Sequence, residues 1–159
     1  MKKKLYLICP DCCIEEKIRL EYGNHTYFLT ALGSVFNMAN FEYAEEVNDL
    51  LNRESISDIC IVNDIQCSFL ENTFTKKFQS NTRAEQVLNS LYESNEARFE
   101  SLRPEQQQKI LARLNIVRQA KELMKIPIIG NKISNQTIKV SGLLYDRKAQ
   151  EFEKFNISI

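Results

Sequence analysis

The sequence has few of the features that mark disordered, membrane-spanning or nucleic-acid-binding chains. It holds four glycines and three prolines in 159 residues, which argues against a disordered or low-complexity chain. No apolar run approaches the ~20 residues that cross a membrane. Its 21 basic and 21 acidic side chains cancel, so no net field attracts nucleic acid or an anionic membrane. We therefore expect neither partner, whereas an enzyme is not excluded.

The N-terminal stretch imitates a secretory signal only briefly. Three lysines precede an apolar run over residues 5–9, and Pro10 and Asp11 end this run. A secretory core needs roughly 7–15 apolar residues. The sequence therefore predicts a cytosolic, cytoplasmic protein.

The cysteines form a poor disulfide framework. They are odd in number and three of them lie close together in the sequence: Cys9, Cys12, Cys13, Cys60 and Cys67. In a reducing compartment such clustering indicates metal or thiol chemistry. Cys60 lies inside the apolar run of residues 59–62, and we expect it to be a small buried hydrophobe.

The apolar pattern predicts an α/β fold with a mostly parallel central sheet and flanking helices. Continuous apolar runs at residues 5–9, 27–32 and 59–62 are typical of strands buried on both faces. A short helix that ends near Gly23 separates the first two runs, and a helix capped by Asn40 separates the second and third. Strands that alternate with helices are the signature of a parallel sheet.

The second half of the chain is helical and then returns to strands. Apolar stripes predict one helix around residues 84–92 and another that begins near Pro104 and continues until Pro127. A fourth strand is expected at residues 137–145 and a short edge strand within 150–159. We interpret residues 1–159 as a single domain.

Thiol and carboxylate side chains follow two of the predicted strands. Cys9 and Asp11 follow the first strand, and Asp64 and Cys67 follow the third. Ligands of open α/β sheets gather at the carboxyl ends of the strands. A helical turn between Asp64 and Cys67 would aim both at one point. Two thiolates with one or two carboxylates match a tetrahedral zinc site.

Several short motifs extend this pattern along the chain. Cys9-Pro10-Asp11-Cys12-Cys13 follows the first strand, and Glu42-Tyr43-Ala44 follows the second strand and Gly33. Asn63-Asp64-Ile65-Gln66-Cys67-Ser68 follows the third strand. Later, residues 115–119 read Asn-Ile-Val-Arg-Gln, and a Gly and a Tyr-Asp pair end the segment 140–146.

In this order and spacing the motifs resemble the β-class carbonic anhydrases. That family carries Cys-x-Asp-x-Arg, Glu-Tyr-Ala, Gly-His-x-x-Cys-Gly and Asn-Val-x-x-Gln, and then a strand that ends in a Gly and a Tyr-Asp pair. The resemblance covers residues 5–70 and 111–155 and leaves the helical segment 71–110 unplaced. It implies the β-carbonic-anhydrase fold, a zinc site, carbon dioxide or bicarbonate as a possible small inorganic substrate, and a homodimer.

The sequence departs from the family pattern at the metal site. Asp64 occupies the position of the family's zinc-binding His, and Cys13 occupies that of the family's Arg. Asn63 and Ser68 replace two glycines. The single histidine, His25, precedes the second strand and is expected to be a loop residue.

The resemblance assigns the metal to Cys9, Asp64 and Cys67, with Asp11 as the catalytic gate or fourth ligand. In the family, the Asp is held by the Arg and leaves the metal open; with Cys13 in place of that Arg the clamp is lost. Asp11 is then free to close the site. Two thiolates and a carboxylate also bring surplus negative charge, which should make bound water less acidic. We therefore expect a carbonic-anhydrase-like zinc protein, a lyase if active, with weak or lost hydration of carbon dioxide.

Two other interpretations remain open from the sequence. Cys9 and Cys12 form a Cys-x-x-Cys motif after a strand, which resembles the opening of a glutaredoxin and predicts thiol–disulfide chemistry. Alternatively, the chain keeps the scaffold without the chemistry and acts as an interaction protein, with the polar helices of residues 82–125 as the binding surface.

Overall fold

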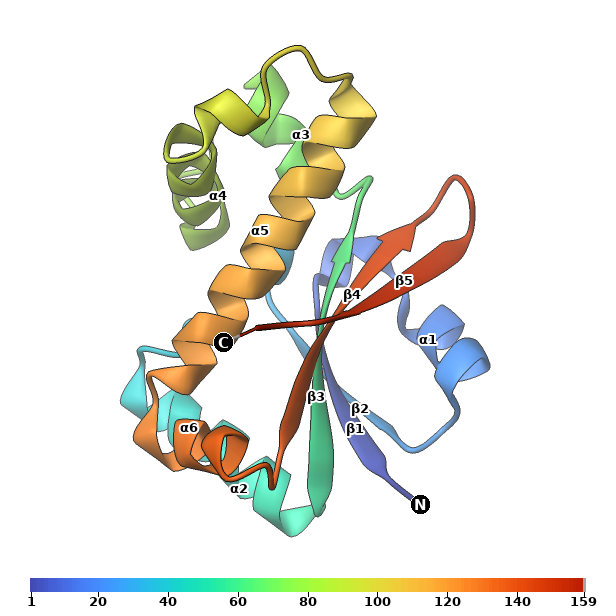
Figure 1. Cartoon of the computed structure of the whole chain (residues 1–159), viewed down its shortest axis with the longest axis vertical. Helices are drawn as coiled ribbons and strands as arrows, with labels where there is room; N and C mark the ends of the chain where they lie inside the picture. Colours follow the sequence, from blue (N-terminus) through green and yellow to red (C-terminus); the bar gives the residue numbers. More distant parts are fainter. Residues whose placement is uncertain (159) are drawn as a thin grey trace.

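A five-stranded sheet forms the centre of the protein. The computed structural model describes residues 1–158, and its strands have the spatial order β2-β1-β3-β4-β5 (Figure 1). The strands β1, β2, β3 and β4 pair in parallel, and β5 pairs with β4 in the antiparallel sense. The bounds are Lys3–Ile8 for β1, Thr26–Thr30 for β2, Ile56–Asp64 for β3, Lys139–Asp146 for β4 and Glu151–Asn156 for β5. The predicted mostly parallel α/β sheet, with a short final edge strand, is confirmed.

Helices cover both faces of this sheet. Helix α1 (Glu15–Tyr22) lies on one side (Figure 1). There the Tyr22 ring meets the Phe152 ring of β5 edge-on, with centroids 5.6 Å apart. Helices α2 (Phe41–Arg53), α5 (Pro104–Met124) and α6 (Pro127–Ser134) lie on the other side. Strands covered on both faces need apolar side chains on both sides, and β1 and β3 accordingly contain the continuous apolar runs 5–8 and 59–62.

The helix boundaries follow local sequence signals. The Asn40 side chain accepts a hydrogen bond from the Tyr43 amide at 3.0 Å and caps α2, as predicted. Gly23 ends α1 with a positive φ of 95°. Pro127 was expected only as the end of the long helix, but it also opens α6, since a proline in the first turn costs no helical hydrogen bond.

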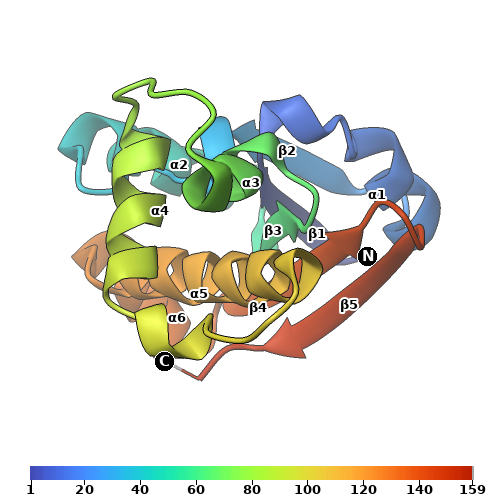
Figure 2. The same ribbon diagram turned by 90° about the horizontal axis from the view of Figure 1, so that it is seen from above.

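The segment that the resemblance left unplaced forms a helical layer beside the strand ends. Helix α3 (Ser68–Thr75), which the apolar pattern did not predict, is followed by α4 (Arg83–Glu93) and a short 3-10 helix, Glu96–Arg98 (Figure 2). The rings of Phe74, Tyr92 and Phe99 lie 5.3–5.4 Å apart and join α3 to α4 and to the turn before α5. These aromatic contacts hold α3 in place and therefore also position Cys67, the N-cap residue of α3.

Within residues 1–158, none of the helices combines the length and the hydropathy that a membrane crossing requires.

Candidate metal centre

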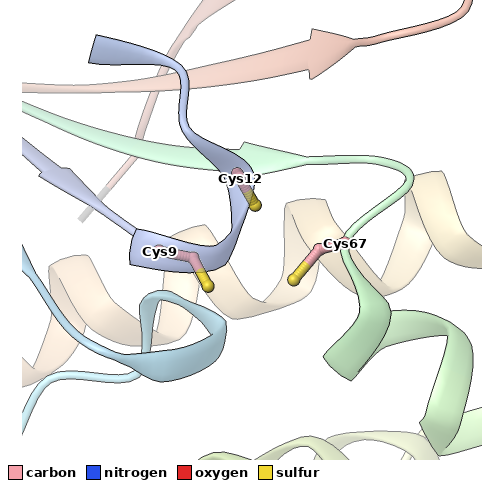
Figure 3. A group of neighbouring side chains, drawn as sticks. All are labelled: Cys9, Cys12 and Cys67. Atoms are coloured by element: carbon pink, nitrogen blue, oxygen red, sulfur yellow. The ribbon is translucent and has the colours of Figure 1, made fainter.

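Three cysteines meet at the carboxyl edge of the two central strands. The strands β1 and β3 are parallel neighbours, with Leu7 opposite Ile61, so their ends reach the same edge of the sheet. The sulfur atoms of Cys9, Cys12 and Cys67 all lie within 4.8 Å of one another, and all three residues are buried (Figure 3). The predicted convergence of Cys9 and Cys67 is present, and Cys12 joins them.

A single turn of 3-10 helix brings Cys12 back beside Cys9. Residues Pro10–Cys12 form this turn, and the Cys12 amide donates to the Cys9 carbonyl at 3.3 Å. With three residues per turn, side chains three apart in a 3-10 helix lie on one side. The next residue, Cys13, has a left-handed φ of 49° and is exposed, so the third thiol of the Cys9–Cys13 stretch stays outside the group.

Cys67 enters the group from the start of α3. It is the N-cap residue of this helix, and its amide donates to the Asp64 carbonyl at 3.0 Å. The sequence predicted a helical turn between Asp64 and Cys67. In the structure Asp64 is instead the last residue of β3, and a hydrogen-bonded turn leads from it to Cys67. Strand geometry and a tight turn send the two side chains to different partners.

The Asp64 carboxylate forms an ion pair with Arg147. Its Oδ2 accepts from Arg147 Nε at 3.0 Å and from Nη2 at 2.7 Å, and its Oδ1 accepts from the Gln66 amide at 2.8 Å. The Asp64 side chain is fully buried, whereas Arg147 is half exposed. The hydrogen bonding to Asp64 and the negative charge of Asp64 raise the pKa of Arg147 above its ordinary value, although partial desolvation of Arg147 acts in the opposite direction.

Neither of the two predicted carboxylate ligands belongs to the three-thiol group. Among residues 1–158, the only set of three or more metal-ligating side chains that converge is the three cysteines. Asp11 lies exposed in the 3-10 turn, and His25 lies exposed in the loop before β2. Ligation by Asp11 and Asp64 therefore remains a prediction that requires side-chain movement.

The three thiols share protons unequally. Hydrogen bonds from Cys12 and Cys67 lower the pKa of Cys9 to about 3 and outweigh its burial. Hydrogen bonds with Cys67 and Cys9, together with burial, raise the pKa of Cys12. For Cys67, the hydrogen bond with Cys12 lowers the pKa, but the hydrogen bond with Cys9 and burial together outweigh it. The net effect raises the pKa of Cys67 to about 12. The arrangement thus stabilises one thiolate, at Cys9, between two thiols.

This donor set fits a zinc ion. Bonds of about 2.3 Å in a tetrahedron place sulfur atoms about 3.8 Å apart, so sulfurs within 4.8 Å need only small rotations to reach one ion. Thiolates are the soft ligands that zinc accepts, and three of them leave a fourth position free. The Gly33 amide donates to the Cys9 sulfur at 3.2 Å, a contact of the kind that orients metal ligands.

A protein-family model matches almost the whole chain. The model described as carbonic anhydrase aligns with residues 9–152, which include the three cysteines, the strands β2, β3 and β4 and the start of β5, whereas β1 precedes the match. The chain belongs to the carbonic anhydrase family. A search of curated proteins found no match to the chain.

Solved structures of β-carbonic anhydrases share this fold. CafA of Aspergillus fumigatus aligns with a TM-score of 0.84 and 17% identity, over 99% of this chain and 77% of CafA. A tetrameric enzyme of Sordaria macrospora aligns at 0.80 and 13% identity, over 97% and 80% of the two chains. The Coccomyxa enzyme, in complex with acetazolamide, aligns at 0.76 and 12% identity, over 98% and 74%. At these identities the likeness concerns the fold.

This carbonic anhydrase family member thus differs from the motif pattern in a specific way. At the position of the expected His, Asp64 is bound to Arg147, and the third donor of the group is Cys12. The Cys-x-x-Cys spacing was the available signal for Cys12, whose role the sequence left open between a spare metal ligand and a redox partner. Arg147 carries no motif, because its role depends on the pairing of β3 with β4, where Asp64 lies opposite Tyr145.

Proposed function

We propose that this carbonic anhydrase family member binds zinc through Cys9, Cys12 and Cys67. The observation that carries the proposal is the convergence of three buried sulfur atoms within 4.8 Å at the carboxyl ends of β1 and β3. Family membership supports zinc as the metal. The five free cysteines also fit the cytoplasmic location expected from the sequence, since reducing compartments keep thiols free.

We further propose that hydration of carbon dioxide is weak or lost. A bound zinc ion would supply an acidified water molecule for attack on carbon dioxide. Three thiolates carry three negative charges against the two positive charges of the ion, so the site as a whole is anionic and disfavours loss of a proton from that water. Asp64 is engaged by Arg147 and Asp11 is exposed, so neither predicted carboxylate belongs to the proposed ligand group in this structure.

Stopped-flow measurement of carbon dioxide hydration tests this proposal. Zinc-loaded protein is expected to hydrate carbon dioxide no faster than its Cys9→Ser variant, which lacks one proposed ligand. A kcat/KM in the range of working enzymes, about 10⁴ M⁻¹s⁻¹ or more, that falls to background in Cys9→Ser would contradict the loss of hydration. That result would still support the metal site.

A second candidate function is thiol–disulfide exchange at Cys9 and Cys12. It is favoured by their sulfur separation of at most 4.8 Å and by the lowered pKa of Cys9. The reaction would transfer two electrons from these two thiols to a disulfide substrate, with release of two thiols from the substrate. Incubation of the purified protein with oxidised glutathione separates the candidates. If the protein, used as purified, forms a reversible Cys9–Cys12 disulfide during this incubation, redox chemistry is favoured. If bound zinc protects the thiols from oxidation, the metal site is favoured.

We also propose that the chain forms a homodimer. The family resemblance implies this state, and a Sordaria macrospora structure is described as tetrameric. Analytical ultracentrifugation at micromolar concentration is expected to give about twice the chain mass of 18.5 kDa. A species of single-chain mass at every concentration would contradict the proposal.

A further inference from the structure

A buried amide network lies behind the cysteine group, on the side of α5. Asn115, which has no exposed surface, directs its Nδ2 toward the Gly33 carbonyl at 3.1 Å and the Ser34 carbonyl at 3.4 Å. The same Nδ2 lies 2.8 Å from Asn63 Oδ1 at the end of β3. One side chain of α5 thus holds both the 33–34 turn and the strand that leads to Cys67.

Gln119 extends the network by one helical turn. Its Nε2 donates to Asn115 Oδ1 at 3.3 Å, which orients the Asn115 amide, and its Oε1 accepts from the Phe36 amide at 3.0 Å. Both side chains are buried, and buried amides are placed in a core only where they are satisfied. Asn115 and Gln119 therefore clamp residues 33–36 from one face of α5.

The clamped turn has a conformation that it would not readily keep alone. Gly33 and Ser34 have positive φ values of 64° and 55°, and a Cβ at Gly33 would lie 3.2 Å from the Ala84 Cβ. Ser34 Oγ donates to the Val62 carbonyl at 2.6 Å and ties the turn to β3. In this conformation the Gly33 amide donates to the Cys9 sulfur at 3.2 Å.

We propose that Asn115, with Gln119 behind it, is a positioning residue for the metal ligand Cys9. It acts through the Gly33 turn: the side-chain amide fixes the Gly33 carbonyl, and the Gly33 amide on the other side of that residue orients the Cys9 sulfur and stabilises its negative charge. This inference rests on the proposed metal site. Hydrogen bonds to ligand atoms fix their direction, and loss of such a contact typically costs about 10- to 100-fold in metal affinity.

The test compares Asn115→Leu with a matched control, Asn72→Leu. Asn72 is also a buried asparagine that clamps a turn, since it donates to the Phe78 carbonyl at 2.9 Å and accepts from the Phe78 amide at 3.0 Å, but its side chain forms no hydrogen bond with Gly33. Zinc affinity is measured by competition with a chromophoric chelator, and the visible spectrum of the cobalt-loaded protein reports the ligand geometry. Both variants are expected to lose stability.

Only Asn115→Leu is expected to lower zinc affinity, by about tenfold or more, and to change the thiolate-to-cobalt absorption. Unchanged affinity and spectrum in Asn115→Leu, with zinc bound normally by the unmodified chain, would contradict this inference alone. Failure of the unmodified chain to bind zinc or cobalt would contradict the proposed function and this inference together. If Asn115→Leu does not fold, Gln119→Met decides in the same assays, because it keeps the volume and removes the contact with Asn115.

Discussion

Replacement of Cys12 by serine is expected to weaken zinc binding by at least about 100-fold, because a hydroxyl is a far poorer zinc ligand than a thiolate. The expectation follows from the position of the Cys12 sulfur, within 4.8 Å of the sulfurs of both Cys9 and Cys67. Elemental analysis of protein purified without added metal, followed by chelator competition, measures the effect.

Cys13→Ser is the matched control for this variant. Cys13 is adjacent to Cys12 in sequence, but its side chain is exposed and lies outside the three-thiol group. The Cys13→Ser substitution is therefore expected to leave the zinc content unchanged. If Cys12→Ser keeps its zinc while Asp64→Asn or Asp11→Asn loses it, the carboxylate ligands predicted from the sequence replace the three-thiol site. If a double Cys9→Ser, Cys67→Ser variant has the same metal content and stability as the unmodified chain, the interaction-protein interpretation gains support.

Replacement of Arg147 by alanine is expected to lower the free energy of unfolding by about 2 kcal/mol. The Asp64 carboxylate is fully buried and would lose two of its three hydrogen-bond donors, which leaves a buried charge without a counterion. The effect falls below that of a wholly buried pair because Arg147 is half exposed and water can enter its place. Urea denaturation followed by circular dichroism measures it.

The neighbouring Lys148→Ala variant provides the comparison for Arg147→Ala. Lys148 pairs with Glu105 at 2.6 Å, but both side chains are about two-thirds exposed, so its loss is expected to leave the free energy of unfolding nearly unchanged. Adding Asp64→Asn to Arg147→Ala should recover part of the lost stability, since the unpaired charge is removed. Equal effects of Arg147→Ala and Lys148→Ala would show that the buried pair contributes nothing beyond a surface contact.

The sheet was predictable because its strands carry the pattern themselves. Residues 5–9 and 59–62 are continuously apolar, and parallel strands covered on both faces need that composition. Helix α3 was not predictable in the same way. Its eight residues include one fully buried leucine, Leu70, and its packing depends on aromatic contacts of Phe74 with Tyr92 and Phe99, far along the chain.

The candidate site was predictable where it depends on strand ends and not where it depends on side-chain partners. Cys9 and Cys67 follow adjacent strands, so topology alone brings them together. Asp64 also lies at a strand end, but a guanidinium 83 residues later in the chain binds its carboxylate. Sequence spacing could not reveal that partner, nor could it show that the 3-10 turn returns Cys12 toward Cys9.

Zinc-edge X-ray absorption of the protein as purified tests the central claim most directly, because it counts the sulfur atoms bound to the metal. We predict zinc with three sulfur neighbours at about 2.3 Å and one lighter atom. Zinc with two sulfur neighbours and carboxylate oxygens, or protein that carries no zinc, would contradict it.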